Sequence, residues 1–181
     1  QAGRMSSALD WLRPRRTEPV IQLAADAAWA RYDGLAGRTP GDVLVPADLL
    51  AGREGRAGAV ADLVPAGAAL ARETAVWVHA GGPAPRRVSV VVPVHRRVRG
   101  PLRIHRQQLA PGDVEAVGGV LITTPLRTAV DLVRFAPEAA ALTGVRALLD
   151  AGLSPAALRE AVDTARAGPR RRAQARLALL T

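Results

Sequence analysis

The stretch that most constrains the fold runs from residue 120 to residue 134 and reads VLITTPLRTAVDLVR. Its first four residues are apolar and mostly β-branched, which is typical of a buried strand. Thr124 is suited to cap the start of a helix, and Pro125 is suited to the first helical position. We therefore predict a strand that leads directly into a helix, with the change at Thr124.

The predicted helix has two distinct sides. Apolar residues recur with helical spacing along one of them, at Leu126, Ala129, Val130 and Val133. We expect Val130 and Val133 to be buried on the sheet. Arg127, Asp131 and Arg134 share another side. The pair Arg127 and Asp131 is either an ordinary exposed ion pair or an ordered polar contact beneath a binding surface, and the sequence leaves both interpretations open.

Residues 119–134, GVLITTPLRTAVDLVR, resemble a segment of actinobacterial AbiEi-type antitoxins that reads G-V-x-h-T-[ST]-P-x-R-T-h-x-D-L-h-R, where h is apolar. The positions of this family motif are Thr124, Pro125, Arg127, Thr128 and Asp131. Residues 72–79, RETAVWVH, resemble a helix of the same proteins. The resemblance covers about residues 42–180, and residues 119–134 carry its most specific part.

The resemblance implies a function. AbiEi-type antitoxins belong to type IV toxin–antitoxin systems, repress their own operon through an N-terminal winged helix, and counter a nucleotidyltransferase toxin without being enzymes. Many of these proteins end in an endonuclease-like domain. This sequence departs from the pattern twice, because no winged-helix pattern is recognisable before Asp42 and the chain stops where an endonuclease-like domain would begin.

Arginine supplies all of the positive charge. The sequence has 25 basic residues, none of them lysine, against 16 acidic residues, and its formal net charge is +9. A GC-rich genome explains arginine in place of lysine, but it does not explain the excess of basic over acidic residues. Because the guanidinium group matches paired phosphate oxygens and stays charged, we expect contact with DNA or another polyanion.

Two basic groups are the candidate nucleic-acid-binding residues. The first surrounds two expected antiparallel strands, 88–94 and 102–107, with a basic connection at the tip of their hairpin, and comprises Arg86, Arg87, Arg96, Arg97, Arg99, Arg103 and Arg106. The second opens the last predicted helix and comprises Arg170, Arg171 and Arg172. Basic residues at a helix start oppose the helix dipole unless they meet an external anion. The alternatives are a charged edge strand that blocks strand addition and a solvated helix face.

The predicted fold class is α+β. Residues 1–40 are expected to form an N-terminal helical extension that is partly disordered, and residues 41–181 an AbiEi-like α+β domain. Strands at 43–45, 88–94, 102–107 and 117–123 would form a small antiparallel β-sheet covered by helices, one of them over residues 68–79, and the C-terminal half would be α-helical.

The composition argues against catalysis and cofactors. Without cysteine or lysine, the sequence excludes disulfides, thiolate metal sites, Schiff-base chemistry and the P-loop. The three histidines, His79, His95 and His105, are too few and too separated to suggest a metal site, and His79 is expected to cap the C-terminus of its helix. We therefore predict no enzyme, no catalytic residues, no metal and no cofactor.

Localisation is expected to be cytoplasmic, with no membrane partner, because the sequence contains no run of 18 apolar residues and no signal-peptide pattern. The leading hypothesis is an antitoxin-like or transcriptional-regulatory binding protein of a type IV toxin–antitoxin system, with a nucleotidyltransferase toxin encoded nearby. The alternative is an accessory domain, or a catalytically inactive remnant, of an endonuclease-like protein. The neighbouring genes would discriminate between the two hypotheses.

Overall fold

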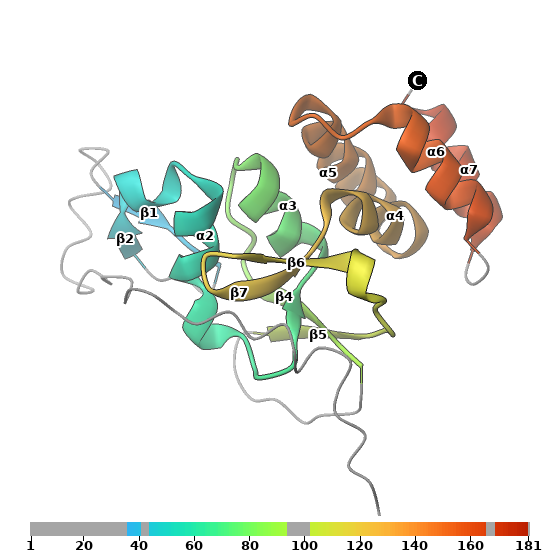
Figure 1. Cartoon of the computed structure of the whole chain (residues 1–181). Helices are drawn as coiled ribbons and strands as arrows, with labels where there is room; N and C mark the ends of the chain where they lie inside the picture. Colours follow the sequence, from blue (N-terminus) through green and yellow to red (C-terminus); the bar gives the residue numbers. More distant parts are fainter. Residues whose placement is uncertain (1–35, 41–43, 94–101, 166–168, 181) are drawn as a thin grey trace, which may run out of the picture.

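The computed structural model describes residues 36–40, 44–93, 102–165 and 169–180. The predicted helical extension lies outside the described residues up to residue 35, and so do Arg96, Arg97 and Arg99. The described chain forms a mixed β-sheet with helices on it and a separate group of C-terminal helices (Figure 1). The predicted α+β class with a helical C-terminal half is therefore confirmed.

The main sheet has five strands in the order β5-β4-β3-β7-β6. Their bounds are β3 (Ala69–Leu70), β4 (Val88–Val92), β5 (Leu102–Arg106), β6 (Val114–Val117) and β7 (Val120–Thr123). At the centre of the sheet, Leu70 pairs antiparallel with Val90 and parallel with Ile122. The sheet is thus mixed, whereas the sequence predicted an antiparallel one.

The central strand β3 corrects the predicted helix over residues 68–79. Ala69 and Leu70 are extended, and helix α3 (Arg72–Ala80) begins only after them. A two-residue strand is too short to show the alternation that marks a strand in the sequence. Its conformation is decided by partners that lie far away along the chain.

The predicted hairpin of residues 88–94 and 102–107 has the wrong orientation. Strands β4 and β5 do lie side by side, but they run parallel, with Val88 opposite Leu102 and Val92 opposite Arg106. Alternation of apolar and polar residues predicts a strand without predicting its direction, and the short connection favoured a hairpin because parallel pairs usually need a longer crossover. Consequently the starts of β4 and β5 lie at the same end of the sheet.

Two further strand predictions change in detail. The strand predicted over residues 43–45 is seen from residue 44 onward and does not join the main sheet, because β2 (Leu44–Pro46) pairs antiparallel with β1 (Ala36–Arg38) in a sheet of their own. The predicted strand over residues 117–123 contains a turn, and β6 and β7 form a tight hairpin with Val117 opposite Val120. Gly118 and Gly119 form this turn with φ of 53° and 79°, conformations that glycine adopts without strain.

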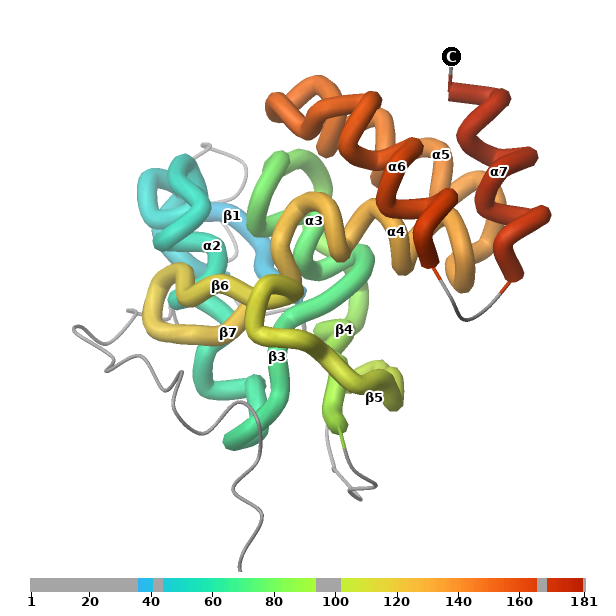
Figure 2. Tube along the Cα trace, turned by 45° about the vertical axis from the view of Figure 1, so that its right-hand side comes forward, coloured from blue at the N-terminus to red at the C-terminus, as the bar shows by residue number. Residues whose placement is uncertain are grey.

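The helices form two groups. The N-terminal group consists of the 3-10 turns η3 (Ala47–Leu50) and η4 (Ala61–Leu63) and the helices α2 (Arg53–Ala59) and α3. After the 3-10 turn η5 (Pro111–Asp113), the C-terminal group consists of α4 (Pro125–Phe135), α5 (Glu138–Asp150), α6 (Pro155–Thr164) and α7 (Arg170–Ala178). Figures 1 and 2 both show α4–α7 gathered at one end of the molecule and α2 with the β1–β2 pair at the other.

The predicted start of α4 is confirmed. Thr124 is the N-cap, and its Oγ1 accepts a hydrogen bond from the backbone N–H of Arg127 at 3.3 Å. Pro125 is the first helical residue, where its missing N–H has no intrahelical partner to lose. The change from strand to helix therefore occurs at Thr124, as the sequence predicts.

Each group of helices has its own apolar core. The first core lies between the sheet and helices α2 and α3, with Trp77, Val90 and Ile122 buried in it. The second core is formed by α4–α7 and includes Val130 and Val133. The predicted burial of these two valines is confirmed, but they pack among helices rather than on the sheet, because the apolar side of α4 faces α5, α6 and α7.

Candidate functional site

The family-motif arginine is held in a buried polar junction. The Arg127 guanidinium donates through Nε to Asp131 at 3.0 Å and through Nη1 to Asp113 at 2.6 Å. The Asp131 side chain is only 1% exposed and also accepts from Gln107 Nε2 at 3.3 Å. Arg127 and Asp131 therefore form an ordered contact rather than an exposed ion pair. This contact ties α4 to the segment between β5 and β6.

The motif threonine Thr128 is equally well fixed. Its hydroxyl lies 2.7 Å from that of Thr123 and donates to the Thr123 carbonyl at 3.1 Å. His79 Nε2 lies 2.8 Å from the same carbonyl and donates to it. His79 was expected to cap its own helix, but its ring instead joins α3 to β7. Burial lowers the pKa of His79, so the ring is neutral near pH 7.

A hollow of about 360 Å³ adjoins this junction. Thr124 and Pro125 line it together with His79 and Arg53 and with residues of the turn between α5 and α6. Arg53 is held by Glu115, whose carboxylate lies 2.7 Å from its Nη2. The motif therefore borders a recess between the sheet and the helical group.

The described arginines of the first basic group lie before β4 and on the edge strand β5. Arg86 and Arg87 are exposed just before β4, and Arg103 and Arg106 are exposed on β5. Because β4 and β5 are parallel, Arg86 and Arg87 lie at the end of the sheet where β5 begins. Arg103 and Arg106 are separated by an odd number of positions, so they point to opposite faces.

Among the described residues, Arg103 forms an ion pair with one acidic side chain, that of Glu73. Its Nη1 lies 3.7 Å from Glu73, and the Arg103 side chain is 55% exposed. An exposed pair at this distance leaves the guanidinium largely available to an external acceptor. The structure does not gather the whole first group on one face.

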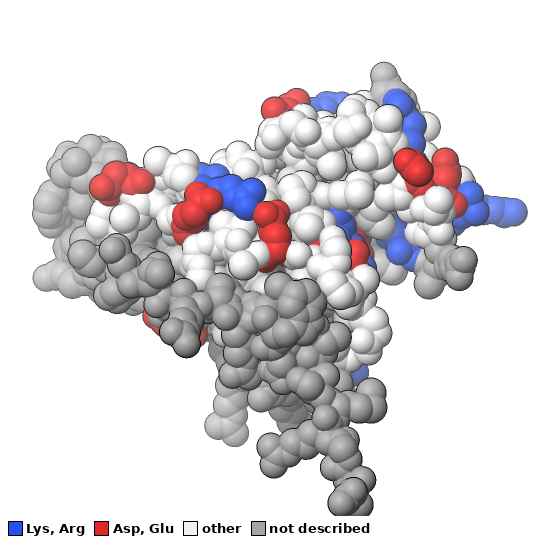
Figure 3. All heavy atoms as spheres, viewed as in Figure 1, with Lys and Arg blue, Asp and Glu red and all other residues white. Residues whose placement is uncertain are grey.

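The second basic group is exposed at the start of α7. Arg170, Arg171 and Arg172 all face solvent, and Arg170 lies 3.8 Å from Asp163, which is also exposed. Figure 3 shows blue and red side chains interleaved on the face it presents, rather than one continuous basic area. Blue side chains project at the right-hand edge of this view, where α6 and α7 lie.

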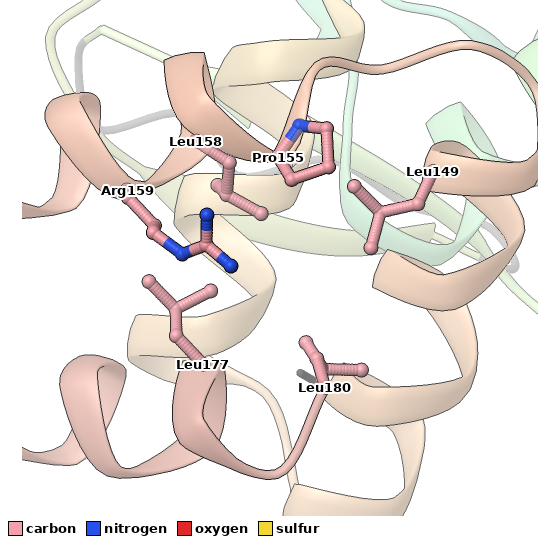
Figure 4. A pocket seen from close by; sticks show the side chains of 6 residues that line it. All are labelled: Leu149, Pro155, Leu158, Arg159, Leu177 and Leu180. Carbon is pink, nitrogen blue, oxygen red and sulfur yellow. The ribbon is translucent and has the colours of Figure 1, made fainter.

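Helix α7 also contributes to a hollow of about 250 Å³ between α5, α6 and α7. The residues that line it are Leu149, Pro155, Leu158, Arg159, Leu177 and Leu180. Figure 4 shows the Arg159 guanidinium lying between Leu158 and Leu177. The lining is thus apolar apart from one arginine.

Sequence reasoning missed a further arginine cluster, separate from the two basic groups, which lies around Phe135. The guanidinium carbons of Arg72 and Arg134 lie over the Phe135 ring, 5.4 and 5.0 Å from its centroid. The His105 ring is close enough to Arg72 and Arg103 for their charges to affect it. Burial, followed by these two arginines, lowers the pKa of His105 to about 4. The available signal was an isolated phenylalanine beside Arg134 at the polar side of a helix.

Metal and membrane features were also sought in the described residues. No three histidine or carboxylate side chains of this part of the chain come together as metal ligands do. Among the helices of the same residues, none has the length and apolar character needed to cross a bilayer.

The segment from β3 through α7 matches a known protein family. Residues 66–180 match the model of the AbiEi antitoxin C-terminal domain. The chain belongs to the AbiEi antitoxin family. The match begins just before β3, so residues 42–65, which the resemblance also covered, lie outside it. No curated protein and no solved structure matches the chain.

The AbiEi domain contains the second core, most of the first core and every family-motif residue. Its antitoxin family is a non-enzymatic, regulatory one, which agrees with the expected class of function. In this AbiEi domain the motif residues Thr124, Arg127, Thr128 and Asp131 hold the junction of sheet and helices together. These contacts are internal to the domain.

Proposed function

We propose that this protein acts as an antitoxin-type regulator that contacts nucleic acid through the phosphates, using the arginines at the β4–β5 edge of its sheet. The main support for this proposal is that four arginines are exposed on or beside an edge strand: Arg86, Arg87, Arg103 and Arg106. Parallel pairing of β4 and β5 supports the proposal, because it brings the first two arginines to the end where β5 begins.

The chemistry of the edge favours phosphate over base recognition. Arginine side chains on a strand edge reach phosphate oxygens from several directions, whereas base reading requires an element that enters a groove. Arg96, Arg97 and Arg99 belong to the same proposed surface by sequence and lie outside the described residues. We expect binding that is largely independent of sequence and that weakens steeply as salt is raised.

Two triple variants of equal charge test the surface. The first replaces Arg86, Arg87 and Arg106 with serine, and the second replaces Arg170, Arg171 and Arg172 with serine. Fluorescence anisotropy with a labelled duplex across a salt series gives the log–log slope. We expect the first variant to flatten the slope by about one unit per lost phosphate contact. The proposal fails if the first variant and the unchanged chain give equal slopes, and a flatter slope in the second variant alone moves the site to α7.

Membership of the antitoxin family also supports a toxin partner. We propose a nucleotidyltransferase toxin encoded beside this gene, with neutralisation of that toxin as the regulatory output. Co-expression of the neighbouring gene with and without this chain measures growth rescue directly. A neighbouring gene of another class, or a longer reading frame with a downstream nuclease domain, would favour the alternative of an accessory domain of an endonuclease-like protein.

A further inference from the structure

We propose that Phe135 and the arginines around it form a binding site for an unstacked base of single-stranded nucleic acid together with its adjacent phosphate. This site is distinct from the duplex contact proposed above, because it lies around α3 and the end of α4 and recognises a base. The two sites meet at β5, which carries Arg103 and His105. The probe class is therefore a single strand, whose bases are free to leave the stack.

An exposed aromatic ring and two guanidinium groups lie together at this site. Phe135 is 36% exposed, one of two large apolar side chains exposed in the described part of the chain. The guanidinium carbons of Arg72 and Arg134 lie over its ring. Alternating aromatic and guanidinium planes are the surfaces on which proteins stack the bases of single strands. A base can extend this arrangement without a sequence preference, since every base has a flat face.

Both guanidinium groups lie over the ring, and hydrogen bonds from Nε do not hold them. Nε of Arg72 and Nε of Arg134 are enclosed, yet neither donates to any other residue in the described ranges. The nearby acids are engaged elsewhere, since Asp131 accepts from Arg127 and Gln107. The charges of Asp131 and Glu73 still act on Arg72, but no hydrogen bond from its Nε fixes the guanidinium to either acid.

Glu73 does not neutralise the cluster. One of its oxygens accepts from the Ser89 hydroxyl at 3.1 Å, and the other lies 3.7 Å from Arg103. His105 completes this side of the cluster, and its Nε2 is enclosed without a hydrogen-bond partner among the described residues. A phosphate placed here would meet arginines on more than one side and would lie near the His105 ring.

The backbone at Arg72 supports a functional role. Arg72 has φ of 49°, the only positive φ of a non-glycine residue in the described ranges. Glycine would adopt this conformation without strain, but only a long side chain reaches the Phe135 ring from this position. Strained backbone of this kind is concentrated at binding and catalytic sites.

The test compares single-stranded and duplex probes on the full chain. Phe135→Leu keeps an exposed apolar side chain and removes the ring, and Phe135→Trp keeps a ring. With a labelled single-stranded oligonucleotide, we expect Phe135→Leu to bind about tenfold more weakly than the unchanged chain, and Phe135→Trp to bind at least as tightly. Duplex affinity should be the same in all three proteins. Arg146→Gln, an exposed arginine on α5, is the control for general loss of charge.

Several outcomes overturn the site. Equal single-strand affinity of the unchanged chain and Phe135→Leu removes the stacking role, and so does absence of single-strand binding at low salt. If Phe135→Leu loses as much affinity for the duplex as for the single strand, the site is only a phosphate contact, and the base-binding inference is overturned. Loss of duplex binding in the edge variants bears only on the proposed function. Unfolding curves show whether Phe135→Leu folds. If it does not fold, Arg134→Gln replaces it in the test, and we expect Arg134→Gln also to weaken single-strand binding.

A second readout is independent of affinity. If a phosphate binds beside His105, the added negative charge stabilises the protonated ring, so the pKa of His105 must rise when the single strand is added. Titration of the His105 ring protons by NMR, with and without the oligonucleotide, measures this change. An unchanged pKa at saturating oligonucleotide would contradict the proposed place of the phosphate.

Discussion

At the scale of single residues, two arginines serve the interior of the protein. Arg56 donates to the carbonyl of Val78 at the end of α3, from Nε at 3.1 Å and from Nη2 at 2.9 Å. Arg176 donates through Nη1 to the carbonyls of Val133 and Ala136 at 3.0 and 2.8 Å. Both place a positive charge at the C-terminal end of a helix, where backbone carbonyls lack partners. Part of the excess positive charge is therefore structural.

Arg176→Met should destabilise the fold by about 3 kcal/mol, because two buried carbonyls lose a charged donor while the apolar packing is largely kept. Arg172→Met, at an exposed position of the same helix, should change the free energy of unfolding by less than about 0.5 kcal/mol. Urea unfolding followed by circular dichroism measures both. Equal losses in the two variants would mean that the capping contacts do not stabilise α4.

The family-motif arginine shows how far residue-level prediction reached. The spacing of Arg127 and Asp131 predicts their contact, which is confirmed. Asp113 could not be predicted as the second partner, because it lies before β6 and reaches Arg127 only through the fold. The Phe135 cluster was missed for a related reason: Arg72 comes from α3, and nothing in the spacing of α4 places it there.

At the scale of elements, the β6–β7 hairpin rests directly on α2. A Cβ on Gly118 would collide with the backbone of this helix, and the φ of 53° at Gly118 adds strain for any other residue. The turn thus needs glycine for its conformation and for the close approach. Local sequence signals of this kind predict elements well, as at Thr124 and Pro125, whereas the direction of β5 and the existence of β3 depend on distant partners.

Gly118→Ala should destabilise the protein by about 2 kcal/mol or more, because the added methyl group forces the hairpin away from α2. Gly112→Ala is the matched control, since a Cβ at Gly112 would meet no atom within 4 Å. Thermal unfolding of both variants compares them. A larger loss in the Gly112 variant would contradict the close approach of hairpin and helix.

The helical core makes a second prediction at this scale. Val130→Asp places an unpaired carboxylate among α4–α7 and should destabilise the protein by about 4 kcal/mol. Ala139→Asp introduces the same charge at an exposed position near the start of α5, where it is favourable. Equal thermal stability of Val130→Asp and the unchanged chain would show that the apolar side of α4 is not buried.

At the scale of the whole molecule, two enclosed histidines make stability depend on pH. Burial is the main cause that lowers the pKa of both His79 and His105, the latter to about 4. Below the unfolded pKa of about 6.5, the unfolded chain binds protons that these rings do not take up in the fold. The protein should therefore lose stability as pH falls from about 6.5 toward 4.

Urea unfolding at pH 7.0, 6.0 and 5.0 measures this loss, because most carboxylates remain ionised over that range. His105→Gln should flatten the dependence, since it removes one of the two titrating rings and keeps a polar group. His95→Gln is the control in the same chain. If the free energy of unfolding depends on pH in the same way in His105→Gln and in the unchanged chain, the His105 ring is not buried in its neutral form.

The placement of β3 between β4 and β7 has a consequence for synthesis of the protein. Leu70 pairs with Val90 on one side and with Ile122 on the other, so the chain emerging from a ribosome leaves one edge of β3 unpaired until β7 has been translated. Strands with unpaired edges are the segments most prone to join a neighbouring chain. The strand that closes this edge leads directly into α4, whose apolar side in turn needs α5–α7. Productive folding of the nascent chain must therefore wait for its C-terminal half, and truncated products of this gene should accumulate as aggregates rather than as a folded N-terminal fragment.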